Sequence, residues 1–187
     1  MKKMLIAALV CAMVSSVGCD KIKDAASRDF NVKNVKFDFS AITEGAAASA
    51  SAVGMRAETP NTFSVTREVN LSEIGSSDLM DYAGKISKVA VNSSLLNITA
   101  SPSGSYSVAN VTVKADGVSG SLLVPSYTLG GTFTAPANMN AYTSTFIMKL
   151  LSAKTITVTV SGQTDAPAGT TIRISYESDL LFTASLL

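Results

Sequence analysis

The chain from Thr171 onward alternates apolar and polar side chains without a break in parity, and this pattern most constrains the fold. Successive side chains of a β-strand point to opposite faces, so the pattern predicts one very long strand or two collinear strands with one buried face. Alternation of this half-polar kind favours antiparallel pairing. The even positions expected to face the core are Ile172, Ile174, Tyr176, Ser178, Leu180, Phe182, Ala184 and Leu186.

The same period of two recurs upstream. From Thr155 to Val160 three aliphatic residues alternate with three threonines, and Phe63 to Leu71 alternates with Arg67 as an interruption. Phe30 to Thr43 alternates in two phases, which predicts a β-bulge near Lys33-Asn34. Shorter or irregular strand patterns cover Ile86 to Val91, Leu96 to Thr99, Tyr106 to Ala115 with a slip in phase, and Leu122 to Thr134 as a pair broken at Gly130-Gly131.

Turn and loop signals separate these segments. The shorter ones are Ser101 to Gly104 and Asp116-Gly117, and a polar loop is expected over Ser161 to Gly169. Gly45 to Pro60 is rich in Ala and Ser, and it reads either as a mobile loop or as a flap over a binding edge.

Two short helices interrupt the strands. Ser77 is a suitable N-cap for the first, whose apolar face is Leu79, Tyr82, Ala83 and Ile86. In the second, Asn140 is the N-cap candidate, and the helical spacing is carried by Met139, Tyr142, Phe146, Leu150 and Ala153. Each helix precedes a strand, so we expect each to cap an end of a sandwich and lead into that strand. The predicted fold over residues 30–187 is therefore mainly β: an antiparallel two-sheet β-sandwich with two short helices.

The N-terminus has the layout of a signal peptide. Lys2 and Lys3 precede the apolar run Met4 to Val14, which is too short to span a bilayer. Small residues then precede Cys19, and Ser16-Val17-Gly18-Cys19 resembles a bacterial lipobox, in which the cysteine is acylated. We therefore expect a signal peptide over residues 1–18, lipidation of Cys19 and a spacer within residues 19–29.

A lipid on Cys19 makes the membrane the expected partner, and it places the chain in the bacterial cell envelope. We expect the outer membrane, although Asp20 after the cysteine resembles the inner-membrane retention signal of enterobacterial lipoproteins. Cleavage leaves 169 of 187 residues, which suits one domain. Two of the 15 basic residues are lost, leaving 13 against 14 acidic ones, so no basic surface for nucleic acid is expected.

Composition removes several kinds of chemistry. The chain has no histidine and no tryptophan, and its two cysteines lie in the signal peptide and at the lipidation site. Serine–histidine and cysteine–histidine catalysis, zinc sites and disulfides are therefore not expected, and no catalytic residue, metal or cofactor is assigned. For calcium the nearest candidate is Asp78 with Asp81, which reads better as a solvated helix face.

Carboxylates and aromatic rings were the remaining candidates. Glu177 and Asp179 share a predicted wet strand face and could act as a glycosidase pair, although neither lies in a recognisable motif. Four tyrosines could form a sugar platform, but most fall on apolar faces and are expected in the core: Tyr106, Tyr127, Tyr142 and Tyr176.

Three segments carry a family resemblance: Phe63 to Leu71, Tyr82-Ala83-Gly84-Lys85-Ile86, and Ile156 to Gly162 with the β-rich tail to Leu187. In their order they resemble small β-rich lipoproteins of Bacteroidota, mostly of unknown function. The resemblance covers most of the mature chain. It implies only a fold and a cellular location, because none of the three segments is a catalytic motif.

Three functions follow as hypotheses. The first is a non-enzymatic structural or binding module of the envelope, which would contact an unidentified protein or glycan through sheet edges and loops. The second is an amphiphile-binding or lipid-binding protein, in which the two helices cover a cavity between the sheets. A carboxylate-based hydrolase is the third and the least favoured.

Overall fold

The computed structural model describes residues 27–45, 60–75, 77–135 and 137–185. Its strands are β1 (Ser27–Glu44), β2 (Asn61–Asn70), β3 (Ile86–Ser101), β4 (Ser107–Ala115), β5 (Leu122–Val124), β6 (Tyr127–Thr128), β7 (Thr132–Thr134), β8 (Thr155–Thr164) and β9 (Thr171–Ser185). The helices are η1 (Leu71–Ile74), α3 (Ser77–Tyr82), η2 (Ala83–Lys85) and α4 (Ala137–Ala153), where η marks 3₁₀ turns. The expected signal peptide, Cys19 and the interior of the Gly45 to Pro60 loop lie outside these residues.

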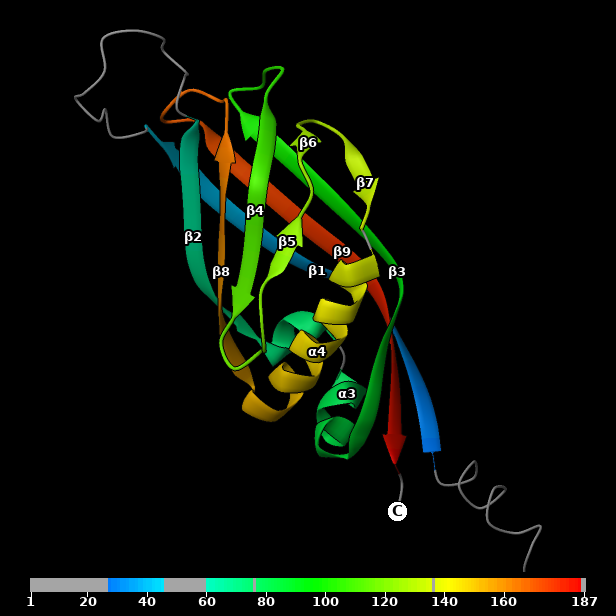
Figure 1. The fold of residues 1–187 in the computed structure, drawn as a ribbon. Helices are drawn as coiled ribbons and strands as arrows, with labels where there is room; N and C mark the ends of the chain where they lie inside the picture. The colour runs from blue at the N-terminus through cyan, green and yellow to red at the C-terminus, as the bar shows by residue number, and fades with distance from the viewer. Residues whose placement is uncertain (1–26, 46–59, 76, 136, 186–187) are drawn as a thin grey trace, which may run out of the picture.

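The strands form two antiparallel layers that meet at one corner (Figure 1). One layer contains β1, β9, β3 and β7, and the other contains β2, β8, β4 and β5, with β6 also paired to β4. The corner is the short pairing of β1 with β2, at Thr43 with Phe63 and at Glu44 with Thr62. Beyond it the two strands diverge, each into its own layer. The predicted mainly β, antiparallel two-layered sandwich with two short helices is confirmed.

A single long strand, β9, forms the centre of the first layer. It pairs with β1 on one side and β3 on the other, and its buried residues are the even-numbered ones from Ile172 to Ala184. The unbroken parity of the sequence therefore corresponds to one strand rather than two. The first and last strands of the described chain lie side by side, from Ser27 with Ser185 to Ile42 with Thr171.

Bulges reset the phase of three strands. The predicted bulge in β1 lies between Val32 and Val35, with Asn34 at a φ of 56°. The slip in β4 is also real, because its register with β8 shifts beside Asn110, whose φ is 51°. Two register shifts in β3, between Ile86 and Lys88 and between Val91 and Ser93, were not predicted. Each bulge lets apolar residues on both sides of it face the same interior.

Several predicted boundaries were wrong. The two strands expected over Ile86 to Thr99 are one strand, because the bulge absorbs the polar interruption between them. Leu122 to Thr134 is not a strand pair: β5 and β6 both pair with β4, whereas β7 crosses to β3 in the other layer. The expected loop after Ser161 begins later, since β8 continues to Thr164, and β1 begins three residues before Phe30.

The helices link the two layers. α4 follows β7 of one layer, leads into β8 of the other, and contacts β3, β5 and β8. It begins at Ala137, so Asn140 lies inside the first turn and the N-cap assignment was wrong. There the Asn140 Oδ1 accepts a hydrogen bond of 2.5 Å from Ser94 Oγ of β3. α3 begins at Ser77, so this residue lies inside the helix and is not the N-cap that was expected. The helix leads through η2 into β3, as expected.

Candidate functional site

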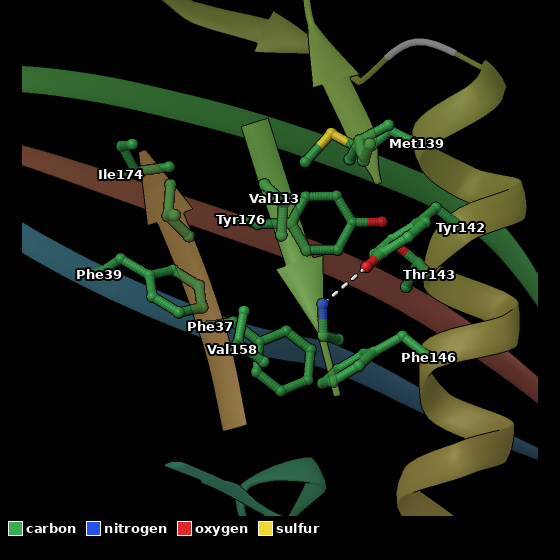
Figure 2. Close-up of a pocket in the computed structure, with 13 residues that line it drawn as sticks. Phe37, Phe39, Val113, Met139, Tyr142, Thr143, Phe146, Val158, Ile174 and Tyr176 are labelled. Atoms are coloured by element: carbon green, nitrogen blue, oxygen red, sulfur yellow. Dashed lines mark hydrogen bonds between the residues drawn. The ribbon is translucent and has the colours of Figure 1, made fainter. Parts of the chain in front are cut away.

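An apolar hollow of about 60 Å³ lies between the two layers, beside α4 (Figure 2). Its walls come from both sheets and from the helix, and no lining residue is charged. The lining residues are Phe37, Phe39, Val113, Ala115, Leu122, Met139, Tyr142, Thr143, Phe146, Val158, Val160, Ile174 and Tyr176.

Strand and helix periodicity place these side chains together. The strand residues are the inward-facing members of alternating segments in β1, β4, β5, β8 and β9. On α4, Met139, Tyr142, Thr143 and Phe146 occupy one helical face by their spacing. The Phe146 ring meets the Phe37 ring edge-on, with 5.6 Å between centroids and 83° between planes, and this contact docks α4 on β1.

A second contact fixes α4 to the opposite layer. The backbone N–H of Ala115 in β4 donates a hydrogen bond of 2.9 Å to the Tyr142 hydroxyl, shown as the dashed line in Figure 2. Burial raises the pKa of Tyr142, and this hydrogen bond offsets only part of the rise. The Tyr142 hydroxyl therefore stays protonated at neutral pH, and it accepts one hydrogen bond from the Ala115 backbone in the wall of the hollow.

The Tyr176 hydroxyl, on another lining residue, has no such hydrogen bond. Tyr176 is only 6% exposed, and its hydroxyl lies on the α4 side of the ring (Figure 2). Hydroxyls of Thr143, Ser94 and Ser178 are near enough to lower its pKa, but burial has the larger effect and raises it. None of the described residues makes a hydrogen bond of normal length and angle with the Tyr176 or the Ser178 hydroxyl.

These hydroxyls form a buried polar patch between β3, α4 and β9. Ser94, Thr143, Tyr176 and Ser178 are each at least nine-tenths buried, and they come from β3, α4 and β9. A buried hydroxyl without a hydrogen bond costs about 1–3 kcal/mol, so such a group calls for a reason. We refer to these four residues as the hydroxyl patch.

An arginine lies behind one wall. Arg67 of β2 stacks on the Phe39 ring, with its guanidinium carbon 4.8 Å from the ring centroid. Both terminal nitrogens donate to Glu73 Oε2 at 3.0 Å, so its charge is already paired. Arg67 interrupts the alternation of β2 because its guanidinium stacks on the Phe39 ring. Phe39 lines the hollow, and Arg67 does not.

The carboxylates proposed as a hydrolytic pair lie elsewhere. Glu177 and Asp179 are on the opposite face of β9 from Tyr176. The Asn34 backbone N–H and the Ser93 hydroxyl donate to Asp179 at 3.0 Å each, and these two bonds lower its pKa. A carboxylate held ionised in this way suits a structural role. In the part of the chain that the structure describes, no group of three or more acidic or cysteine residues could hold a metal.

A second depression, of about 330 Å³, lies on the surface near the corner of the two layers. Its lining residues are mostly polar and are exposed or half-buried, except Phe63, the one aromatic residue in it, which is 2% exposed and faces the core. It offers no free aromatic ring on which a sugar could stack, so we favour the interior hollow as the candidate site. The depression is lined by Glu44, Thr62, Phe63, Ser64, Asn110, Ser161, Gly162 and Gln163.

Sequence reasoning located parts of this site without recognising it. The tyrosines expected in the core do pack there: Tyr176 is buried, and Tyr106, Tyr127 and Tyr142 are half-buried against the core. One of the functional hypotheses also placed a cavity between the sheets, covered by the two helices. Sequence reasoning did not predict that six elements meet around one hollow or that the hydroxyl patch assembles beside it. The only local signal was Ser178, a polar residue on an otherwise apolar strand face.

The fold and site together define a β-sandwich with a helix-covered apolar hollow. No protein-family model and no curated protein matches the chain. Among solved structures, a chain of desmodium yellow mottle tymovirus matches with a TM-score of 0.26 and 10% identity, covering 86% of this chain and 90% of its own. TmCBM61 in complex with β-1,4-galactotriose matches with a TM-score of 0.22 and 12% identity, covering 85% and 88%. We base neither fold nor function on these two structures, because both TM-scores are below 0.5.

Within the described ranges, no helix combines the length and the apolar character needed to cross a bilayer.

Proposed function

We propose that this chain is a non-enzymatic binding module of the bacterial cell envelope, and that it holds the apolar part of a small amphiphile between its sheets. The observation that carries the proposal is the interior hollow, whose thirteen lining residues include no charged side chain. Sites for small molecules are concave, mostly apolar and furnished with a few polar groups. The hollow is concave and its surface is almost wholly apolar, although Tyr142, Thr143 and Tyr176 are among its lining residues.

The absence of chemistry among the lining residues supports a binding role rather than a catalytic one. They include no carboxylate, amine or guanidinium, so among them only the tyrosines and Thr143 carry polar side-chain atoms. General acid–base catalysis needs a group whose pKa lies near the working pH. Burial raises the pKa of both Tyr142 and Tyr176, which moves these values further from neutral pH. We therefore propose binding without turnover.

The proposed location in the cell envelope follows from the expected lipidation of Cys19. An acylated cysteine there would anchor the domain, and the fold from Ser27 onward would lie outside the cytoplasm. Such a location suits a protein that takes up a membrane-derived or environmental amphiphile, because the ligand is at hand. The signal peptide, the lipid and the envelope location remain part of this proposal and rest on the sequence.

Two measurements test this proposal: recovery of a bound ligand from the purified protein, and binding of a small amphiphile in solution. Both are compared between the wild type and a variant whose new side chain fills the hollow. The protein purified from its own membranes would be extracted with organic solvent and the extract analysed by mass spectrometry, and binding of 1-hexanol to the purified protein would be followed by NMR. Val113→Phe adds a ring to a lining position of β4 and is expected to abolish recovery of the ligand and to weaken 1-hexanol binding at least tenfold.

Leu123→Phe is the matched control. Leu123 lies on neighbouring β5 but is 58% exposed, on the face that points away from the hollow. We expect it to bind as the wild type does. Equal binding by the Val113→Phe protein, or no bound ligand and no 1-hexanol binding in the wild type, would leave the chain as a structural module that acts through its edges and loops.

A further inference from the structure

We propose that the surface depression at the corner of the two layers is a second binding site, and that its ligand is a neutral oligosaccharide. The proposal goes beyond the function assigned to the interior hollow and does not depend on it. The volume of the depression, about 330 Å³, falls within the ~300–1,000 Å³ of ordinary ligand pockets. Its lining residues come from four strands, β1, β2, β4 and β8.

The polar side chains of the depression form two rows that cross the strands. In the first row Glu44 is opposite Thr62, and Thr62 is opposite Gln163. In the second row Ser64 is opposite Ser161. Neighbouring strands lie ~4.8 Å apart, and residues two positions apart on one strand are separated by about 6.8 Å. The rows therefore spread hydrogen-bonding groups over an extended area, which suits a ligand that carries many hydroxyl groups.

The hydroxyls inside the depression are free, whereas those just outside it are paired. Thr66 and Thr159 face each other on the same two strands, and their hydroxyls share a hydrogen bond of 2.8 Å. Ser64 and Ser161 also face each other, but neither side chain makes a hydrogen bond with any described residue. The same is true of the Thr62 side chain. The hydrogen-bonding capacity of this sheet face is therefore unused at the place where the surface is hollowed.

The bulge in β4 adds an amide to the first row. The register of β4 with β8 shifts between Ala109 and Thr112, and a bulge of this kind re-aims a side chain. Asn110 Nδ2 donates a hydrogen bond of 2.7 Å to Gln163 Oε1, so each amide holds the other in place. Asn110 Oδ1 and Gln163 Nε2 make no hydrogen bond with the described residues. The pair therefore still offers an acceptor and donors to a ligand.

The charge of the depression favours a neutral ligand. Glu44 is the one charged residue among the described lining residues, and its exposed carboxylate has no partner among them. A phosphate, sulfate or carboxylate group would be repelled by Glu44 and would find no cation. An ammonium group would pair with Glu44, but it has no acceptor for the hydroxyl and amide donors of the depression. Ligand hydroxyls both donate and accept, so they match all of these groups.

The depression also lies far from the expected membrane anchor. Glu44 is the last residue of β1 and Ser27 is the first, and the corner lies at the opposite end of the sandwich from the end of β9 (Figure 1). Seventeen steps of ~3.3 Å place the two ends of β1 about 55 Å apart. With the Ser27 end held near the bilayer by a lipid on Cys19, the depression would face glycans beyond the membrane surface.

The experiment is an NMR titration of the purified, ¹⁵N-labelled protein with four tetrasaccharides. Cellotetraose, laminaritetraose and mannotetraose are neutral, and tetragalacturonate is anionic. One variant combines Ser64→Ala with Ser161→Ala, and a second carries Glu44→Gln. The matched control combines Thr66→Val with Thr159→Val, because these hydroxyls lie on the same two strands but outside the depression.

We expect at least one neutral tetrasaccharide to bind at millimolar concentration and to shift the amide signals of Thr62, Asn110 and Gln163. The affinity is low because no free aromatic ring lines the depression and exposed hydrogen bonds compete with water. The double serine variant should weaken binding about fivefold or more, the effect of losing one or two neutral hydrogen bonds. The double threonine control should bind as the wild type does.

The carboxylate has its own expected result. Glu44→Gln should weaken binding of the neutral tetrasaccharide about threefold to tenfold, because it removes a charge-assisted hydrogen bond. Tetragalacturonate should bind the wild type more weakly than the neutral ligand does, and Glu44→Gln should narrow that difference.

The outcomes separate this site from the hollow. If no tetrasaccharide binds, or if binding shifts only signals away from the depression, the glycan site is overturned while the function of the hollow stands. An equal loss of affinity in the serine variant and in the threonine control overturns the assignment of the two serines as contacts. Tighter binding of tetragalacturonate than of every neutral tetrasaccharide overturns the assignment of a neutral ligand.

Discussion

At the scale of single residues, Asp179 shows how a carboxylate on an outer strand face can organise the fold. It lies on β9 between the bulges of both neighbouring strands, and accepts hydrogen bonds from Asn34 of β1 and Ser93 of β3. Asn34 has a positive φ, which Asn tolerates better than most residues. The Asp179 side chain therefore stabilises the bulge in β1 and the bulge in β3. These bulges decide which side chains of the two strands face the core.

The pH dependence of stability is a prediction at this scale. The folded state lowers the pKa of Asp179 below its ordinary value of 3.8, because the Asn34 N–H and the Ser93 hydroxyl stabilise the ionised form. A lowered folded-state pKa contributes stability above the unfolded pKa, and that contribution is lost as the pH falls through the folded value. We expect Asp179→Asn to lower the thermal midpoint at pH 7, and the difference from wild type to shrink below pH 3.8.

Thermal unfolding followed by circular dichroism across this pH range gives the answer. Glu177→Gln, on the same face of the same strand, is the control and should show a smaller effect at pH 7. A gap between wild type and Asp179→Asn that stays constant from pH 7 to acid would contradict the role assigned to the ionised carboxylate.

At the scale of secondary-structure elements, the pairing of β2 with β8 depends on a missing side chain. Gly162 lies opposite Phe63, and a Cβ built on it would lie 2.6 Å from the Phe63 Cζ and 3.1 Å from Val111 Cγ2. Phe63 is 2% exposed and belongs to the corner where the two layers join. The glycine therefore makes room for a ring that packs the corner, which explains a glycine inside a strand.

Gly162→Ala is expected to destabilise the fold by about 1–3 kcal/mol, as overpacking of a core usually does. Denaturant unfolding measures this value. Gly84→Ala is the control: nothing lies within 4 Å of a Cβ there, so the substitution should be close to neutral. Equal stability of the Gly162→Ala protein and the wild type would mean that the Phe63 ring moves freely, and would contradict the tight corner.

At the scale of the whole molecule, the first and last strands pair along most of their length, interrupted by the β1 bulge, and β1 begins at the end of the sandwich where β9 ends (Figure 1). β1 begins at Ser27, so seven residues separate it from the expected lipid on Cys19. Fully extended, they reach about 25 Å at ~3.5 Å per residue. A lipid anchor at Cys19 would therefore keep that end of the domain close to the bilayer.

This arrangement predicts a membrane-bound protein that carries label from radioactive palmitate. Cys19→Ser should lose the label and leave the membrane fraction, because the acyl chains on Cys19 are the expected anchor. Fractionation and autoradiography of the expressing bacterium check both points. An unlabelled wild-type chain that is intact from Met1 in the cytosol would contradict the anchor, whatever the outcome of the ligand experiments.

The sequence alone determined the features that follow from local periodicity. Strand alternation gave the buried faces of β1, β8 and β9, the bulge beside Asn34 and the antiparallel two-layered class, because the side-chain period of a strand is fixed by its backbone. Helical spacing gave most of the buried face of α4, although not its start, and Ala153 of the predicted face is exposed. It gave only part of the first helix, because α3 ends at Tyr82 and Ile86 of the predicted face begins β3.

Only the tertiary structure decided which strands are neighbours, that β7 crosses to the other layer, and that Tyr176, Thr143 and Ser94 meet beside one hollow. These contacts join residues far apart in the chain, and no local pattern encodes them. Their formation depends on how whole faces pack against one another. A single sequence shows which face of a strand or helix is apolar. Which other face packs against it, and how much space remains between the two faces, is decided by packing in three dimensions.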